Sequence, residues 1–196
     1  MFRLHPGDQI GIVACSDALP RQEEGRIREL SRILTRMGLV PVFSDHIFEP
    51  SGTHLIEAGL RADALMRFYA DPSIKAIFDI SGGNLANELL PLLDYPLIKG
   101  SRKPFWGYSD LSTIINAIYT MTGNSSYLFQ VKNPHLGAWR AAGAAFSAVF
   151  AGGQGRPLPG GLGFRPGRAY GGRGDRRKYP LFPEACGHAL YAGFFG

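Results

Sequence analysis

A serine that could act as a nucleophile stands where a short apolar strand is expected to give way to a helix. The stretch FWGYSDLSTIINAIYTMT begins at Phe105, and its first serine is Ser109. A serine at such a turn projects from the sheet edge, beside N–H groups that the start of a helix leaves unpaired. This is the geometry of a nucleophile elbow, in which the N–H of the next residue, Asp110, points at a developing oxyanion. Apolar residues follow at the i, i+3, i+4, i+7 spacing of a helix with one buried face: Leu111, Ile114, Ile115, Ile118 and Met121.

A purely structural interpretation of the same turn is also open. Serine at the start of a helix is often an N-cap that satisfies one unpaired N–H. Asp110 in the first turn would be a favourable partner of the helix dipole. The G-x-S-x-G pattern is also incomplete, because Leu111 stands in place of the second glycine.

Two glycines form a second candidate feature. Gly82 and Gly83 follow the apolar run 74–80 directly and precede Asn84. Such a pair allows a tight turn and lets another group approach the backbone closely. The pair could supply a second oxyanion donor or an anion cradle, or only a turn that needs positive φ. Neither G-x-G-x-x-G nor G-x-x-x-x-G-K-[ST] is present, so nucleotide-phosphate loops have no support.

The pattern of apolar runs predicts an α/β fold. Strands alternate with helices, which implies βαβ crossovers and a mostly parallel sheet with helices on both faces, as in flavodoxin-like folds. The carboxyl ends of such strands meet at one edge, so Cys15-Ser16, Gly82-Gly83 and Ser109 should lie together there. In the second helix Leu60, Ala64, Leu65 and Phe68 should face inward. The expected strands are 9–14, 39–43, 74–80, 103–107 and 125–131, and the expected helices are 21–37, 56–69, 85–93 and the one after Ser109.

Composition narrows the function classes. The 196-residue chain has a net charge of +5, and residues 151–196 hold all of the excess, so no basic stripe for nucleic acid crosses the rest. The two cysteines, Cys15 and Cys186, have no CxxC spacing, and no spacing suggests a metal or cofactor site. Neither a signal peptide nor a run long enough to span a membrane is apparent, which makes the cytoplasm the expected location.

The character of the sequence changes near residue 151. From there on the chain holds 13 of its 26 glycines and shows neither helical nor alternating periodicity. We therefore divide the chain into a domain at 1–135, a helical connection at 136–150 and an irregular Gly/Pro/Arg-rich tail at 151–196.

The order and wording of the motifs resemble the LD-carboxypeptidase family of serine peptidases, including its microcin-immunity-type branch. The resemblance covers about residues 5–135. It rests on GDQIGIVACS, RADALMRFYADPSIKAIFDI and SGGNLANELLPLLDYPLIKGSRKPFWGYSD. It implies a serine-type carboxypeptidase that hydrolyses an L,D-peptide bond, typically in murein tetrapeptides during peptidoglycan recycling. It further implies Ser109 as nucleophile, the N–H groups of Asp110 and Gly83 as the oxyanion hole, and Gly82 and Asn84 at the substrate.

The family's His and Glu, which activate the nucleophile, come from a C-terminal domain, and residues 151–196 do not match it. Glu184 and His188 are only four residues apart, unlike the family pair, so their roles are not carried over. We therefore expect a frameshifted or truncated tail and an impaired enzyme. The alternative is a non-catalytic α/β module that binds a small anion or peptide. The resemblance also allows a homodimer, and the remaining histidines, His5, His46, His54 and His135, have no support as the base.

Overall fold

The core of the protein is one parallel sheet. The structure, a computed structural model, describes residue 2 and residues 4–50 and 55–132. Five strands lie in the order β2-β1-β3-β4-β5, and each neighbouring pair is parallel. The strands are β1 (Gln9–Val13), β2 (Val40–Phe43), β3 (Ile74–Asp79), β4 (Phe105–Gly107) and β5 (Ser126–Leu128). The expected α/β class and all five expected strands are confirmed, with shorter bounds.

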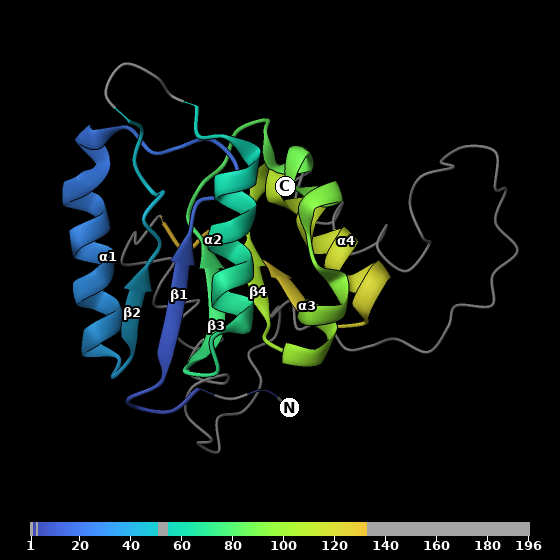
Figure 1. The fold of residues 1–196 in the computed structure, drawn as a ribbon. Coiled ribbons are helices and arrows are strands. Elements are labelled where there is room, and N and C mark those ends of the chain that lie inside the picture. Colours follow the sequence, from blue (N-terminus) through green and yellow to red (C-terminus); the bar gives the residue numbers. More distant parts are fainter. Residues whose placement is uncertain (1, 3, 51–54, 133–196) are drawn as a thin grey trace, which may run out of the picture. The chain divides into compact units, whose positions relative to one another are not determined.

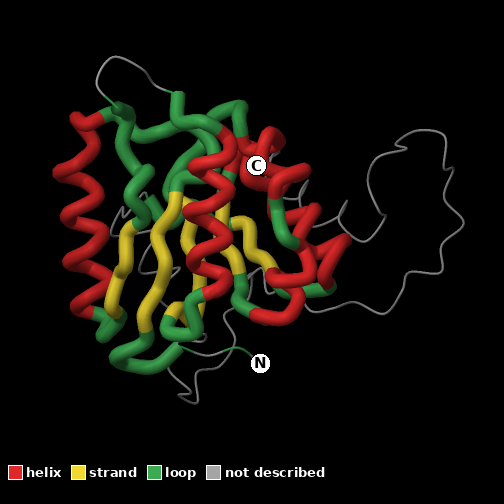
Figure 2. The backbone as a smooth tube through the Cα atoms, viewed as in Figure 1, coloured by secondary structure: helices red, strands yellow, loops and turns green. Residues whose placement is uncertain are grey.

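Helices connect the strands and cover the sheet (Figures 1 and 2). In the described part of the chain, three short 3₁₀ segments accompany four α-helices. The α-helices are α1 (Glu24–Arg36), α2 (Ala58–Ala70), α3 (Tyr95–Ser101) and α4 (Ser112–Thr122). The 3₁₀ segments are η1 (Arg21–Glu23), η2 (Ala86–Leu92) and η3 (Ser109–Leu111).

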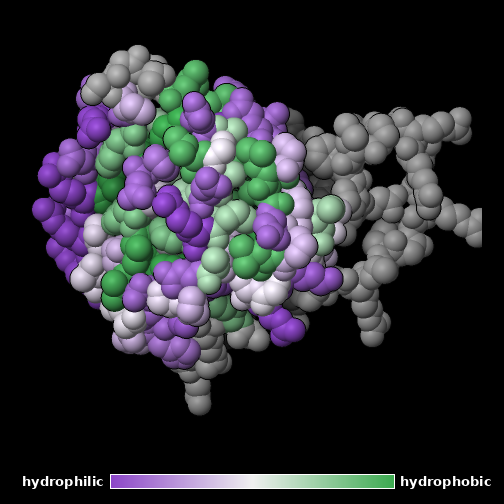
Figure 3. All heavy atoms as spheres, viewed as in Figure 1, coloured by the Kyte–Doolittle hydropathy of each residue, from purple (hydrophilic) through white to green (hydrophobic). Residues whose placement is uncertain are grey.

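The sheet is buried on both faces. Alternate residues of each strand point to opposite sides, and the side chains on both sides belong to hydrophobic clusters. Ile10 and Ile12 of β1 pack in a cluster with α1, whereas Val13 packs in a second cluster with α2, α3 and α4. The helix α1 turns Ile27, Leu30 and Leu34 inward, as its spacing predicts. Its outer side carries charged residues and appears hydrophilic in Figure 3.

Two inward positions were predicted wrongly. Leu60 is 42% exposed and Met121 is 59% exposed. In α2 the neighbouring Arg61 takes the buried position, because its guanidinium binds backbone carbonyl groups there. In α4 the buried stripe runs through Ile114, Ile118 and Thr122, so Met121 lies off it.

The region between β3 and β4 also departs from expectation. The segment expected as a helix at 85–93 is 3₁₀, and it contains Pro91, which has no N–H to donate to an α-helical ladder. The helix α3 was not predicted. It begins after Asp94, whose carboxylate accepts from the N–H of Leu97, and it is only 7 residues long, too short for a clear period.

Two further predictions concern regions that the structure does not test. The proposed connection at 136–150 and the tail at 151–196 lie outside the described residues. Within the described part of the chain, no helix is long and apolar enough to cross a membrane.

Candidate active site

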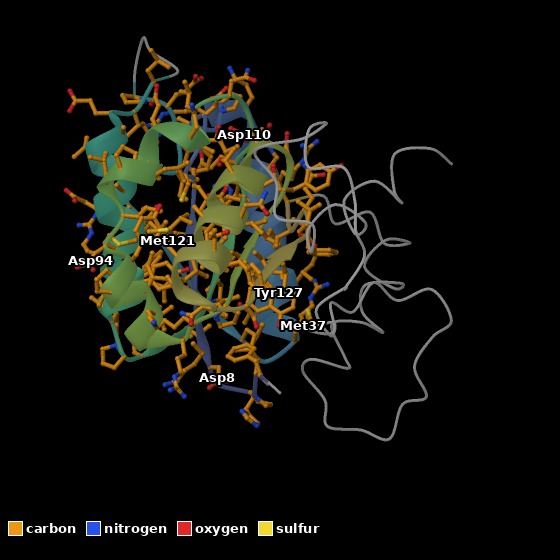
Figure 4. The ribbon with its side chains drawn as sticks, turned by 90° about the vertical axis from the view of Figure 1, so that its right-hand side faces the viewer. Asp8, Met37, Asp94, Asp110, Met121 and Tyr127 are labelled. Atoms are coloured by element: carbon orange, nitrogen blue, oxygen red, sulfur yellow. The ribbon has the colours of Figure 1, made fainter. Side chains whose placement is uncertain are left out.

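The predicted meeting of loops at the carboxyl ends of β1, β3 and β4 is observed. The N–H of Ser16, after β1, donates to Oγ of Ser81, after β3, at 2.9 Å. Oγ of Ser16 donates to the carboxylate of Asp110, after β4, at 2.5 Å. Figure 4 shows Asp110 at one end of the sheet and Asp8, which precedes β1, at the other.

Ser109 is exposed and has an unusual backbone conformation. It is the first residue of η3 and has φ +61°, in the left-handed region. This conformation costs a residue with a Cβ about 1–2 kcal/mol. Tyr108, not Ser109, occupies the cap position of η3, and no side-chain cap bond is present. The N-cap interpretation of Ser109 is therefore wrong.

Close packing beneath Ser109 explains the sharpness of the turn. A Cβ on Gly107 would lie 2.7 Å from Cβ of Leu111, so only glycine fits there. Leu111 itself is fully buried against the α2–α4 side of the sheet. The leucine that breaks the G-x-S-x-G pattern thus anchors the turn in the core.

Two backbone N–H groups on the turns beside Ser109 have no hydrogen-bond acceptor among the residues that the structure describes. The first hydrogen bond of η3 runs from the N–H of Leu111 to the carbonyl of Tyr108, so the N–H of Asp110 precedes it. The N–H of Gly83 has no acceptor among the described residues. The neighbouring Gly82 approaches the nucleophile turn, since a Cβ placed on it would lie 3.8 Å from Cβ of Ser109.

At the glycine turn, Gly83 has no room for a side chain. Gly83 has φ +146°, and a Cβ on it would lie 2.2 Å from the carboxylate of Asp17. The expectation of positive φ is thus confirmed for Gly83. Asn84 is exposed, and its N–H reaches the same carboxylate at 3.4 Å. The predicted site residues Ser109, Asp110, Gly82, Gly83 and Asn84 therefore all lie on the two adjoining loops.

Sequence patterns missed the buried polar groups that hold these loops. The carboxylate of Asp79, the last residue of β3, accepts from the N–H groups of Cys15 and Ser81 and from Oγ of Ser81. Burial raises the pKa of Asp79, and these hydrogen bonds partly oppose the shift. The signal in the sequence that could have revealed them is an aspartate at the end of an otherwise apolar strand, because a buried charge needs hydrogen-bond partners.

Arg61 is the second group that the sequence did not reveal. Arg61 is only 2% exposed, and its guanidinium donates to the carbonyls of Cys15 at 2.8 Å and Leu85 at 3.1 Å. It also forms an ion pair with Glu88. Arg61 thus joins the loop after β1 to the start of η2, and nothing in its helical pattern distinguished it from a surface arginine.

No described residue serves Ser109 as a base. Among the described residues, the Ser109 side chain has no hydrogen-bond partner. His5 lies near Asp8 at the opposite edge, and His46 is half-buried in the loop after β2. His54, His135, Glu184 and His188 lie outside the described residues.

Other chemistries find no support in the described part of the chain. It contains no group of three or more His, Cys, Asp or Glu residues that could hold a metal ion. Cys15 is a free, fully buried thiol, and burial raises its pKa well above the usual range. A shallow hollow lined by α1 and the segment after β2, including Arg28 and Phe48, contains none of the predicted site residues.

Comparison with known proteins agrees with the geometry. Residues 10–128 match the family model described as the LD-carboxypeptidase N-terminal domain. The chain is 31% identical over 134 residues, 68% of its length and 40% of the other, to "Putative carboxypeptidase YocD" of Bacillus subtilis (strain 168). It is 34% identical over 77 residues, 39% of its length and 22% of the other, to the microcin C7 self-immunity protein MccF of Escherichia coli.

Solved structures share the fold. A crystal structure of an MccF-like protein from Bacillus anthracis str. Ames aligns with TM-score 0.65 and 29% identity, over 76% of this chain and 46% of that one. A structure of MccF with aspartyl sulfamoyl adenosine aligns with TM-score 0.68 and 24% identity, over 81% and 50%. The chain spans half or less of the length of each of these relatives.

Proposed function

The chain belongs to the LD-carboxypeptidase family through its N-terminal domain, and we propose from this premise that it carries the nucleophile of a serine-type carboxypeptidase. The proposed reaction is hydrolysis of an L,D-peptide bond at a peptide C-terminus. The observation that carries the proposal is Ser109, an exposed serine held at φ +61° between β4 and α4. Strained backbone of this kind clusters at active sites.

Each predicted residue has a role in the proposed reaction. Oγ of Ser109 attacks the carbonyl carbon, and the carbonyl oxygen takes the negative charge. The N–H groups of Asp110 and Gly83 donate to that oxyanion. The amine of the D-residue then leaves with a proton, and water hydrolyses the acyl-enzyme. Gly82, without a side chain, leaves room for the substrate beside Ser109, and the exposed Asn84 contacts it.

The proposed reaction also needs a base for the proton of Ser109. The resemblance implies a histidine oriented by a glutamate, and neither contacts Ser109 within the described residues. Without such a pair serine stays protonated at neutral pH, and most of the rate that a triad provides is lost. We therefore expect low turnover from the 196-residue chain itself.

The proposed substrate is a murein-type tetrapeptide or a related small peptide, in the cytoplasm. Homology to MccF adds aminoacyl conjugates to the candidates, since one MccF structure contains aspartyl sulfamoyl adenosine. The turn at Gly82-Gly83 has no side chains, so the C-terminal end of a short, extended peptide substrate could lie against it. A homodimer remains part of the proposal, to be tested by light scattering.

Release of D-alanine from a murein tetrapeptide tests the function. We expect slow release by the chain and none by Ser109→Ala. The variant Ser125→Ala, at an exposed serine between α4 and β5, is the matched control and should match the parent. Equal release by the parent and Ser109→Ala would contradict the proposal. Peptide binding by both without any release would favour the binding module instead.

A further inference from the structure

The side chain of Asp110 has contacts that its proposed backbone role does not require. One carboxylate oxygen, Oδ2, accepts from Oγ of Ser16 at 2.5 Å and from the N–H of Ala86 at 3.2 Å. The carbonyl of the same residue accepts from Oγ1 of Thr113 at 2.8 Å. Asp110 is therefore tied to the loop after β1, to the start of η2 and to the first turn of α4.

We propose that the Asp110 carboxylate is a positioning residue. It holds the N–H of Asp110 and the backbone of Ser109 in place by fastening their turn to the neighbouring loops. This inference rests on the proposed function, in which that N–H stabilises an oxyanion. Because the left-handed conformation of Ser109 costs free energy, contacts elsewhere must maintain it.

The direction of the Ser16 hydrogen bond supports a specific clamp. Oγ of Ser16 accepts from the N–H of Leu85 at 3.2 Å, which leaves its single proton to donate. Asp110 is the nearer acceptor at 2.5 Å, whereas Asp17 lies at 3.5 Å. Ser16 is also buried, at 1% exposure. Its hydroxyl is therefore fixed between η2 and the nucleophile turn.

The same clamp reaches the glycine turn. The N–H of Ser16 donates to Oγ of Ser81, the residue directly before Gly82-Gly83. Oγ of Ser81 donates in turn to the buried carboxylate of Asp79 at 2.6 Å. A continuous chain of hydrogen bonds thus runs from Asp79 through Ser81 and Ser16 to Asp110. It connects the loops that carry the two proposed oxyanion donors.

The role of the Asp110 carboxylate is geometric rather than electrostatic. A negative charge near a developing oxyanion opposes it, so the charge itself gives no advantage to the reaction. The second oxygen, Oδ1, is buried and has no hydrogen-bond partner within the described residues. Asparagine could therefore keep its oxygen at the Oδ2 position and retain both contacts without the charge.

The experiment compares Asp110→Asn, Asp110→Ala and Ser16→Ala in the full chain. The first readout is the rate of labelling by a fluorophosphonate probe, with the labelled residue identified by mass spectrometry. We expect labelling of Ser109 to fall about 10- to 100-fold in Asp110→Ala, since small displacements of reacting groups have effects of this size. Ser16→Ala should fall in the same direction, and Asp110→Asn should stay within about threefold of the parent. The conservative variant thus separates positioning from charge.

A second readout does not depend on reactivity. The amide ¹H–¹⁵N chemical shift of Gly83, a residue unchanged in all three variants, should move in Asp110→Ala and Ser16→Ala and remain near that of the parent in Asp110→Asn. Asp63→Ala, at an exposed carboxylate on α2, is the matched control and should change neither readout.

The two failures are distinguishable. No labelling of the parent at Ser109, or equal labelling of Ser109→Ala, contradicts the proposed function. Parent labelling at Ser109 with an unchanged rate in Asp110→Ala overturns the positioning role. An unmoved Gly83 amide in Asp110→Ala overturns it too, whatever the probe does. A large rate loss in Asp110→Asn would show that the charge, not the geometry, is required.

Discussion

At the scale of single residues, the site depends on polar groups that tolerate burial only because they are paired. Ser109 itself is exposed, but the groups beneath it are not. Ser16, Ser81 and Asp79 are each under 5% exposed. Unpaired polar groups at such depth would each cost on the order of 1–3 kcal/mol. Their mutual hydrogen bonds remove that cost and fix the geometry of three loops.

Replacement of Asp79 by Asn tests this pairing. Both oxygens of Asp79 accept hydrogen bonds, from Cys15 on one side and Ser81 on the other. An amide can accept on one side only, so its NH₂ would face a donor. We expect Asp79→Asn to lower the free energy of unfolding by about 1–3 kcal/mol, measured by urea denaturation.

The pKa of Asp79 determines how the stability difference between the parent and Asp79→Asn changes with pH. Burial raises the pKa of Asp79, so the folded chain keeps this proton to higher pH than the unfolded chain does. The stability that the group contributes is full below the unfolded pKa of about 4 and is lost as pH rises through the folded pKa. The difference in unfolding free energy between the parent and Asp79→Asn should therefore shrink as pH rises from about 4. A difference that grows over this range would contradict the assignment.

At the scale of elements, some helices and strands could be predicted from their own sequence and others could not. The strands and α1 have apolar residues at clear spacings, so their existence was evident. The segment η2 and the helix α3 are short and contain proline, and their conformation depends on local hydrogen bonds such as that of Asp94. In α2 the predicted inward residue Leu60 is exposed and its neighbour Arg61 is buried. The guanidinium of Arg61 binds a backbone carbonyl of a distant segment, and this contact outweighs the helical periodicity.

The end of α2 depends on a lysine from a distant element. Nζ of Lys103, before β4, donates to the carbonyls of Phe68 at 2.7 Å and Tyr69 at 2.8 Å and to that of Asp71. Burial lowers the pKa of Lys103, and the carboxylate of Asp71 partly opposes the shift. The lysine thus satisfies the carbonyls that the last turn of a helix leaves unpaired.

Lys103→Met keeps the aliphatic stem and removes the donors. The variant should lose about 1–3 kcal/mol of unfolding free energy, because buried carbonyls lose their partner. Lys99→Met, at an exposed position on α3, is the control and should change stability by less than about 0.5 kcal/mol. Urea denaturation of both variants measures the contrast. Equal stability of the two would contradict the assigned role of Lys103.

At the scale of the whole molecule, parallel topology explains why the candidate site could be located from sequence at all. The carboxyl ends of all strands in a parallel sheet lie at the same edge. The sequence alone therefore predicts that Gly82, Gly83 and Ser109 lie close together. The side-chain partners could not be placed, because Ser16 and Asp110 are 94 residues apart and only the folded sheet brings them together. The hydrogen bonds that join the loops are therefore a property of the tertiary fold and not of any local motif.

The relation to the family is also a property of the whole chain. The matched region at 10–128 includes the carboxyl ends of β1, β3 and β4, where the candidate site lies. The histidine and glutamate that the resemblance implies do not lie at that edge within the described residues. Two parts of the proposed catalysis are thus separate, a nucleophile with its oxyanion donors and a base.

Covalent labelling by a fluorophosphonate probe tests the central claim most directly, namely that Ser109 is a nucleophile served by the N–H groups of Asp110 and Gly83. We predict one probe adduct per chain, located on the peptide that contains Ser109 and absent in Ser109→Ala. A chain that takes up no probe after prolonged incubation, or an adduct that persists in Ser109→Ala, would contradict it.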